Sequence, residues 1–212
     1  MLKSPCLKSL VTLGPAMLVA ATMFIATPAH AAPITFAGTL TPEGPAGSGR
    51  TGTGDVTVVF DAEANFLSVQ ATFSGLSGTT TVAHIHCCTA LPFVGDAGVA
   101  TTTPTFPGFP VGVTSGTFNN TFDTTASSTY NPAFITANGG TPGTPQGAQI
   151  AEAVLLTGML EGRSYFNIHT STFGGGEIRA RLDVVGDVPE PASLLLLGGG
   201  LAGLFIGRRR RP

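Results

Sequence analysis

The chain has 212 residues, a formal net charge of −2 and only 10% charged residues. Between residues 32 and 187 it has four arginines, no lysine and eleven acidic residues, which gives this part a net charge of −7. Nucleic-acid binding depends on basic side chains that neutralise phosphates, so the acidic middle of the chain argues against it. Cations and neutral glycans remain compatible with this charge.

Residues 1–31 have the pattern of a signal peptide. Lys3 and Lys8 precede an apolar run over 10–26, and residues 29–31 have the small-x-small form of a signal-peptidase site. We expect cleavage after Ala31, with an uncleaved anchor as the alternative. Cleavage removes one of the four histidines and one of the three cysteines.

Residues 32–187 are predicted to form one all-β domain. This stretch has no tryptophan but twelve phenylalanines, and short β-branched and aromatic runs alternate with Gly- and Pro-rich segments. The expected fold is an antiparallel, Greek-key-like β-sandwich with one short helix. Strands are predicted over 34–40, 55–61, 66–74, 81–86, 115–123, 165–170 and 177–184, the helix over 149–160, and loops over 41–54, 87–113 and 131–147.

Three histidines are candidates for a metal site. His84 and His86 are two residues apart in a predicted strand, so their side chains point to the same face. His169 lies in a second predicted strand, and three imidazoles that converge are able to bind zinc or copper at about 2.0–2.1 Å. Glu177 or Asp96 is a candidate fourth ligand or hydrogen-bond acceptor for an imidazole. The alternative is a hydrogen-bonded polar network without metal.

Cys87 and Cys88 follow the histidine strand directly and are the only cysteines left after signal cleavage. Exported proteins fold in an oxidising compartment, which disfavours free thiols. Adjacent Cα atoms across a trans peptide are about 3.8 Å apart, shorter than in most disulfides. Three states stay open: a vicinal disulfide, which we favour, soft ligands that extend the histidine site, or reduced thiols.

Residues 188–212 form a second sorting device. Pro189-Glu190-Pro191 precedes an apolar run over 192–207, and four arginines follow at 208–211. A helix over the apolar run would be about 24 Å long, slightly short for a membrane span, and the arginines would remain cytoplasmic. The arrangement resembles the PEP-CTERM sorting signal of Gram-negative bacteria that make extracellular polysaccharide. That resemblance implies processing by an exosortase-type membrane protease; the alternative is an ordinary transmembrane anchor.

The middle of the chain resembles the CHRD domain, an extracellular module of many bacterial exported proteins. The resemblance rests on three motifs in order: Ala83-His84-Ile85-His86, the segment 165–170, and Gly175-Gly176-Glu177-Ile178-Arg179. It spans 34–184 and implies a β-sandwich-like fold without an assigned enzymatic activity. Many bacterial members have Gly-Pro after the His-x-His motif, where this chain has two cysteines.

The sequence contains no nucleophile elbow, phosphate loop or dinucleotide-binding motif. We therefore expect a non-enzymatic module at the cell surface or in the extracellular matrix, associated with the envelope or with polysaccharide. It would be held in the inner membrane only until its C-terminal signal is processed. The alternative function is a copper- or zinc-binding protein, or a metal-dependent redox protein, that uses the three histidines.

Overall fold

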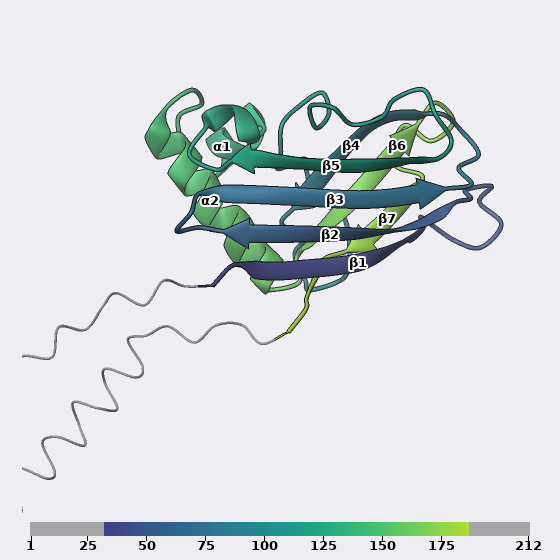
Figure 1. Ribbon diagram of the computed structural model, residues 1–212, viewed down its shortest axis with the longest axis horizontal. Helices are drawn as coiled ribbons and strands as arrows, with labels where there is room; N and C mark the ends of the chain where they lie inside the picture. The colour runs from purple at the N-terminus through teal and green to yellow at the C-terminus, as the bar shows by residue number, and fades with distance from the viewer. Residues whose placement is uncertain (1–31, 187–212) are drawn as a thin grey trace, which may run out of the picture.

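The computed structural model describes residues 32–186, which form a mainly β domain with helices at one end (Figure 1). The predicted signal peptide and the C-terminal sorting segment lie outside the described residues. Within 32–186, no helix is both long and apolar enough to cross a membrane. The strands are β1 (Ile34–Pro42), β2 (Thr53–Asp61), β3 (Phe66–Ser74), β4 (Thr80–Cys87), β5 (Gly116–Asp123), β6 (Ser164–Thr170), β7 (Ile178–Arg181) and β8 (Asp183–Val184).

All eight strands belong to one antiparallel sheet with the order β4-β6-β7-β1-β2-β3-β5, and β8 pairs with β1. Strand β1 joins two layers. Its residues Ile34–Leu40 pair with β2, whereas Thr41 and Pro42 pair with β7. In Figure 1, β4, β6 and β7 cross behind β1, β2, β3 and β5. The predicted antiparallel β class is confirmed, but the two layers belong to one curled sheet and not to two separate sheets.

The hydrophobic core fills the space between the two layers. Strand β3 shows the expected alternation, with Leu67, Val69, Ala71 and Phe73 buried between more exposed neighbours. The buried ring of Phe106 contacts Phe118 of β5 and Phe166 of β6, so it links the two layers. Phe106 comes from the long segment after β4, which was expected to be irregular and contains no named strand or helix.

The described residues contain two α-helices and a short 3-10 helix, η1 (Ser127–Thr129), where one helix was predicted. Helix α1 (Pro132–Ala137) lies in a predicted loop, and α2 (Pro145–Leu160) begins four residues before the predicted start. The same signal opens both helices. Asn131 and Thr144 accept hydrogen bonds from backbone N–H groups of the first turn, and a proline follows each.

The last predicted strand is divided at Leu182 into β7 and β8. Glu177, which precedes β7, is fully buried and ties together three turns that are distant in sequence. One carboxylate oxygen accepts hydrogen bonds from the N–H groups of Thr51 (3.3 Å) and Ser77 (2.6 Å) and from the Ser77 hydroxyl (2.8 Å). The other accepts from Gly78 N–H (3.2 Å) and the Thr170 hydroxyl (2.7 Å). The role is structural, as a turn acceptor.

Glu177→Gln should lower the free energy of unfolding by about 1–3 kcal/mol, because an amide nitrogen would face at least one of these donors. Burial alone would raise the pKa of Glu177, but the hydrogen bonds from Thr170, Ser77 and Gly78 outweigh it, so the pKa is lowered. A lowered carboxyl pKa stabilises the fold above the unfolded-state value of about 4.3 and loses that contribution as the pH falls through the folded-state value.

Urea unfolding at several acidic pH values would measure this contribution. The wild type should lose more stability on acidification than Glu177→Gln does. Asp55 is an exposed acidic residue of β2, and Asp55→Asn is the control for the substitution itself: it should keep the stability of the wild type at neutral pH. Parallel profiles for wild type and Glu177→Gln would contradict this role of the buried carboxylate.

Candidate functional site

The pairing of β4 with β6 brings the three candidate histidines together. The antiparallel register places His84 opposite Asn167 and His86 opposite Tyr165. His169 lies two residues beyond Asn167, opposite Val82, and so on the same face. All three histidines are buried, with exposed fractions of 5%, 7% and 8%. One ring nitrogen of each lies within 4.8 Å of one from each of the others. The structure thus brings the predicted residues into one cluster.

Each imidazole has one nitrogen bonded to a backbone carbonyl. The distances are 2.6 Å from His84 Nε2 to Pro104 O, 2.9 Å from His86 Nδ1 to Ala97 O, and 2.9 Å from His169 Nδ1 to Gly174 O. A carbonyl oxygen only accepts hydrogen bonds, so each of these nitrogens carries the hydrogen. The hydrogen bonds therefore fix all three tautomers.

The opposite nitrogens are left with lone pairs. They are Nδ1 of His84, which is buried without a hydrogen-bond partner, and the Nε2 atoms of His86 and His169, which lie 3.4 Å apart. Two facing lone pairs repel each other unless a proton or a cation lies between them. Nitrogens bound tetrahedrally to zinc at 2.0–2.1 Å would be roughly 3.3–3.4 Å apart. The distance between His86 Nε2 and His169 Nε2 matches this value.

A shared proton is the weaker way to satisfy these lone pairs. The pKa of His84 and of His86 is lowered to about 4, chiefly by burial; the carbonyl hydrogen bonds raise it by less, and the charge of His169 adds to the lowering. His84 and His86 are therefore neutral at pH 7. Neutral imidazole is the form that binds metal ions.

Tyr165 and Arg179 support the cluster from the side. The Tyr165 ring stacks on His86 with 4.8 Å between centroids, and its hydroxyl donates to Ala97 O (3.2 Å), the carbonyl that His86 also uses. The Arg179 guanidinium lies 4.0 Å above the Tyr165 ring. Its charge is paired with Glu43 and Asp96, each at 2.8 Å, which limits its repulsion of a cation.

Two acidic residues proposed as fourth ligands do not reach the cluster. Both carboxylate oxygens of Glu177 accept hydrogen bonds from the turns described above. The Asp96 side chain is 81% exposed and pairs with Arg179. The fourth-ligand prediction is wrong for both. Neither Tyr165 nor Arg179 was predicted as a site residue. Alternation along β6, which puts Tyr165 on the face of His169, is the local signal that points to it. The partners of Arg179 are Glu43 and Asp96.

The irregular segment after β4 completes the site. It runs along the free edge of β4, where Ala100 N–H donates to Ile85 O, and Ile85 and Ala83 N–H groups donate to the hydroxyls of Thr101 and Thr105. This covers a strand edge that would otherwise be open for pairing with another chain. The same segment supplies the carbonyls of Ala97 and Pro104 that orient His86 and His84.

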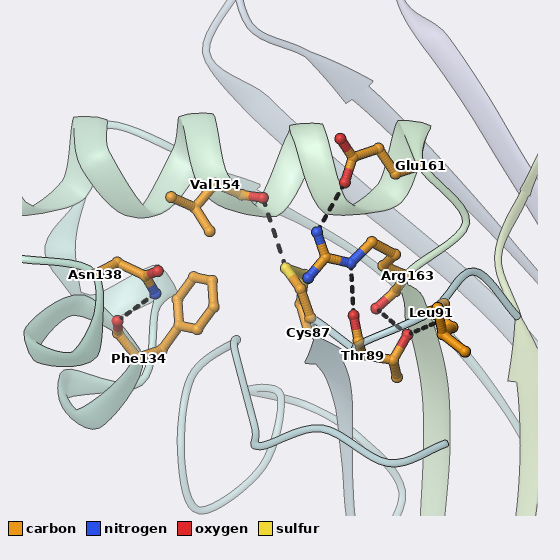
Figure 2. The surroundings of a disulfide bond; sticks show 9 residues. Cys87, Thr89, Leu91, Phe134, Asn138, Val154, Glu161 and Arg163 are labelled. Atoms are coloured by element: carbon orange, nitrogen blue, oxygen red, sulfur yellow. Dashed lines mark hydrogen bonds and ion pairs between the residues drawn. A yellow bond between two sulfur atoms is a disulfide. The ribbon is translucent and has the colours of Figure 1, made fainter. Parts of the chain in front are cut away.

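Cys87 and Cys88 are joined by a disulfide, and the peptide bond between them is cis. Their Cα atoms are 3.0 Å apart, not at the trans spacing of about 3.8 Å used in the sequence argument. Both sulfurs face Gly158 of α2, where a Cβ atom would collide with them. Figure 2 shows the surroundings of the bond next to α2. The candidate metal site consists of the three histidines, and neither cysteine sulfur belongs to it.

Comparisons with known proteins agree with both family resemblances noted in the sequence. The CHRD domain family matches residues 36–182, more than half of the chain. The PEP-CTERM protein-sorting motif matches residues 187–211. Neither the curated proteins nor the solved structures gave a match.

The tautomers are directly measurable. In metal-free protein at neutral pH, long-range 1H–15N spectra should show the Nδ1–H form of His86 and His169 and the Nε2–H form of His84. His84 and His86 should stay neutral well below the ordinary histidine pKa of about 6.5 and take up protons only near pH 4. A His86 ring that is already cationic near pH 6.5 would contradict the lone-pair assignment.

Proposed function

The chain belongs to the CHRD domain family, and we propose that its mature domain binds a metal ion, zinc or copper, through His84, His86 and His169. The observation that carries the proposal is the clustering of three buried imidazoles, each of which keeps one nitrogen free of a carbonyl after the other has bonded one. Outer hydrogen bonds of this kind are typical of histidines that ligate metals, because they fix the tautomer and the ring orientation.

The ligand set favours zinc or copper over harder cations. Imidazole nitrogens suit zinc and copper, whereas magnesium and calcium prefer carboxylate and carbonyl oxygens. No carboxylate and no sulfur joins the cluster within residues 32–186. Three protein ligands leave a further coordination position for water or for a small molecule.

The PEP-CTERM match identifies an exported, envelope-associated protein that an exosortase-type protease processes. We place the domain at the cell surface or in the extracellular matrix, with envelope components or polysaccharide as partners and with transient anchoring in the inner membrane before processing. We propose a non-catalytic role, in which the imidazoles hold the metal and do not act as acids or bases, because each has committed its N–H to a backbone carbonyl. None keeps a free nitrogen for acid–base chemistry once a metal is bound.

Metal binding is tested by elemental analysis of the purified mature domain after loading with zinc or copper and removal of excess metal. The wild type should retain about one equivalent per chain. His84→Ala, His86→Ala and His169→Ala should each lose affinity by at least the 10–100-fold that loss of an outer partner typically costs.

Asn119→Ala is the matched control, because Asn119 is exposed on β5 and remote in sequence from all three histidines. It should bind like the wild type. Far-UV circular dichroism of all variants separates loss of metal from loss of fold. Absence of stoichiometric metal in the folded wild type, or equal binding by the histidine variants, would refute the metal site.

Sorting is tested independently of metal. Glu190→Ala in the full-length chain should block processing, so that the protein accumulates in the inner-membrane fraction at a higher apparent mass. Fractionation and immunoblotting measure this. A variant that reaches the surface at the mature size and in normal amounts would contradict a role of the Pro-Glu-Pro motif in sorting.

A further inference from the structure

A pocket lies on the other side of β4 from the histidines. Side chains alternate along β4, so Cys87 faces away from His86, and the disulfide borders a pocket of about 700 Å³ between helices α1 and α2. This volume falls within the range of about 300–1,000 Å³ usual for small-molecule sites. None of the histidines lines this pocket, so it is separate from the proposed metal site.

The inner wall of the pocket is apolar and has little freedom to move. Cys87 is 4% exposed and packs on Gly158, while Cys88 is half-buried, with its sulfur 3.8 Å from Val154 O. Because a disulfide has no hydrogen to donate, this is a sulfur–oxygen contact. The two sulfurs and Val154 give this wall a polarizable, apolar surface, and the disulfide closes it covalently.

The opposite wall comes from α1 and is held in place by hydrogen bonds. Asn131 accepts from Ala133 N–H (3.0 Å) at the start of α1 and donates to Val99 O (3.0 Å), which ties the helix to the segment after β4. The Phe134 ring points toward the side of the disulfide in Figure 2. An aromatic ring and a disulfide therefore border the same space.

The rim of the pocket is polar but carries no net charge. Glu161 and Arg163 form an ion pair at 2.9 Å with side chains 49% and 35% exposed, and Arg163 Nε also donates to Thr89 O (2.5 Å). Asn138 and Thr157 add an amide and a hydroxyl to the rim. A paired carboxylate and guanidinium offer both acceptors and donors, yet they give a charged ligand no electrostatic advantage.

We propose that this pocket binds a neutral sugar ring of an extracellular polysaccharide. A pyranose has an apolar C–H face, which matches the disulfide and Phe134, and hydroxyl groups, which match the mixed donors and acceptors of the rim. A hydrocarbon would make no hydrogen bonds to the polar rim, and an anionic sugar would gain no attraction from a rim whose carboxylate and guanidinium are already paired. The inference names a site for the polysaccharide partner in the proposed function, and it does not depend on bound metal.

The test is a 1H–15N NMR titration of the mature domain with methyl β-D-glucopyranoside and methyl β-D-galactopyranoside. Glucuronate and n-octanol are the charged and hydrocarbon comparisons. At least one neutral glycoside should shift the amide signals of Val99, Asn138, Thr157 and Gly158. Ala153→Phe adds a ring at an exposed position of α2 that lines the pocket, and it should weaken binding at least about tenfold.

Gln146→Phe adds the same ring to the first turn of α2, at an exposed position outside the pocket, and should leave binding unchanged. His169→Ala should also leave binding unchanged, so a failed metal site and a failed sugar site are distinguishable. The proposal is overturned if no neutral glycoside shifts these signals, if glucuronate or octanol alone binds, or if both phenylalanine variants bind like the wild type.

Discussion

The antiparallel pairing of β4 with β6 is the constraint on which the rest of the site depends. Because side chains alternate, one register puts His84 and His86 on the same face as Tyr165, Asn167 and His169. The same register puts Ile85 and Cys87 on the opposite face, toward the core and α2. A slip of one residue would exchange the two faces, burying imidazoles in the core and moving the disulfide to the histidine side.

The backbone carbonyls around the histidines determine which nitrogen of each ring carries the hydrogen and which is left to bind a metal ion. They take up one N–H from each ring, and burial disfavours the cationic forms of His84 and His86. His84 and His86 are left as neutral rings, and the Nε2 atoms of His86 and His169 face each other. Tyr165 and the paired Arg179 hold this arrangement from the side without adding an uncompensated charge.

Local patterns in the sequence were sufficient for the strands and for the identity of the clustered histidines. The two-residue spacing of His84 and His86 and the clean alternation of β3 are local signals, and the structure follows both. The curl of the sheet was not predictable in this way, because it depends on β1 pairing with β2 along most of its length and with β7 at its end. Helix α1 is only six residues long, and it begins inside the segment 131–147 that was predicted as a loop.

The hydrogen-bond partners of the three histidines could not be predicted from the sequence, for a physical reason. The groups that fix the tautomers are backbone carbonyls of Ala97, Pro104 and Gly174, and any residue provides a carbonyl. Their positions follow from irregular segments without periodicity. The partners of Arg179 likewise come from parts of the chain that are remote in sequence.

Binding of a metal by the three histidines is best tested by anomalous X-ray scattering from crystals of the metal-loaded domain, recorded on both sides of the zinc or copper absorption edge. We expect one peak at about 2.0–2.1 Å from His84 Nδ1, His86 Nε2 and His169 Nε2. A domain that shows no peak among the three imidazoles, or a peak only at other residues, would contradict it.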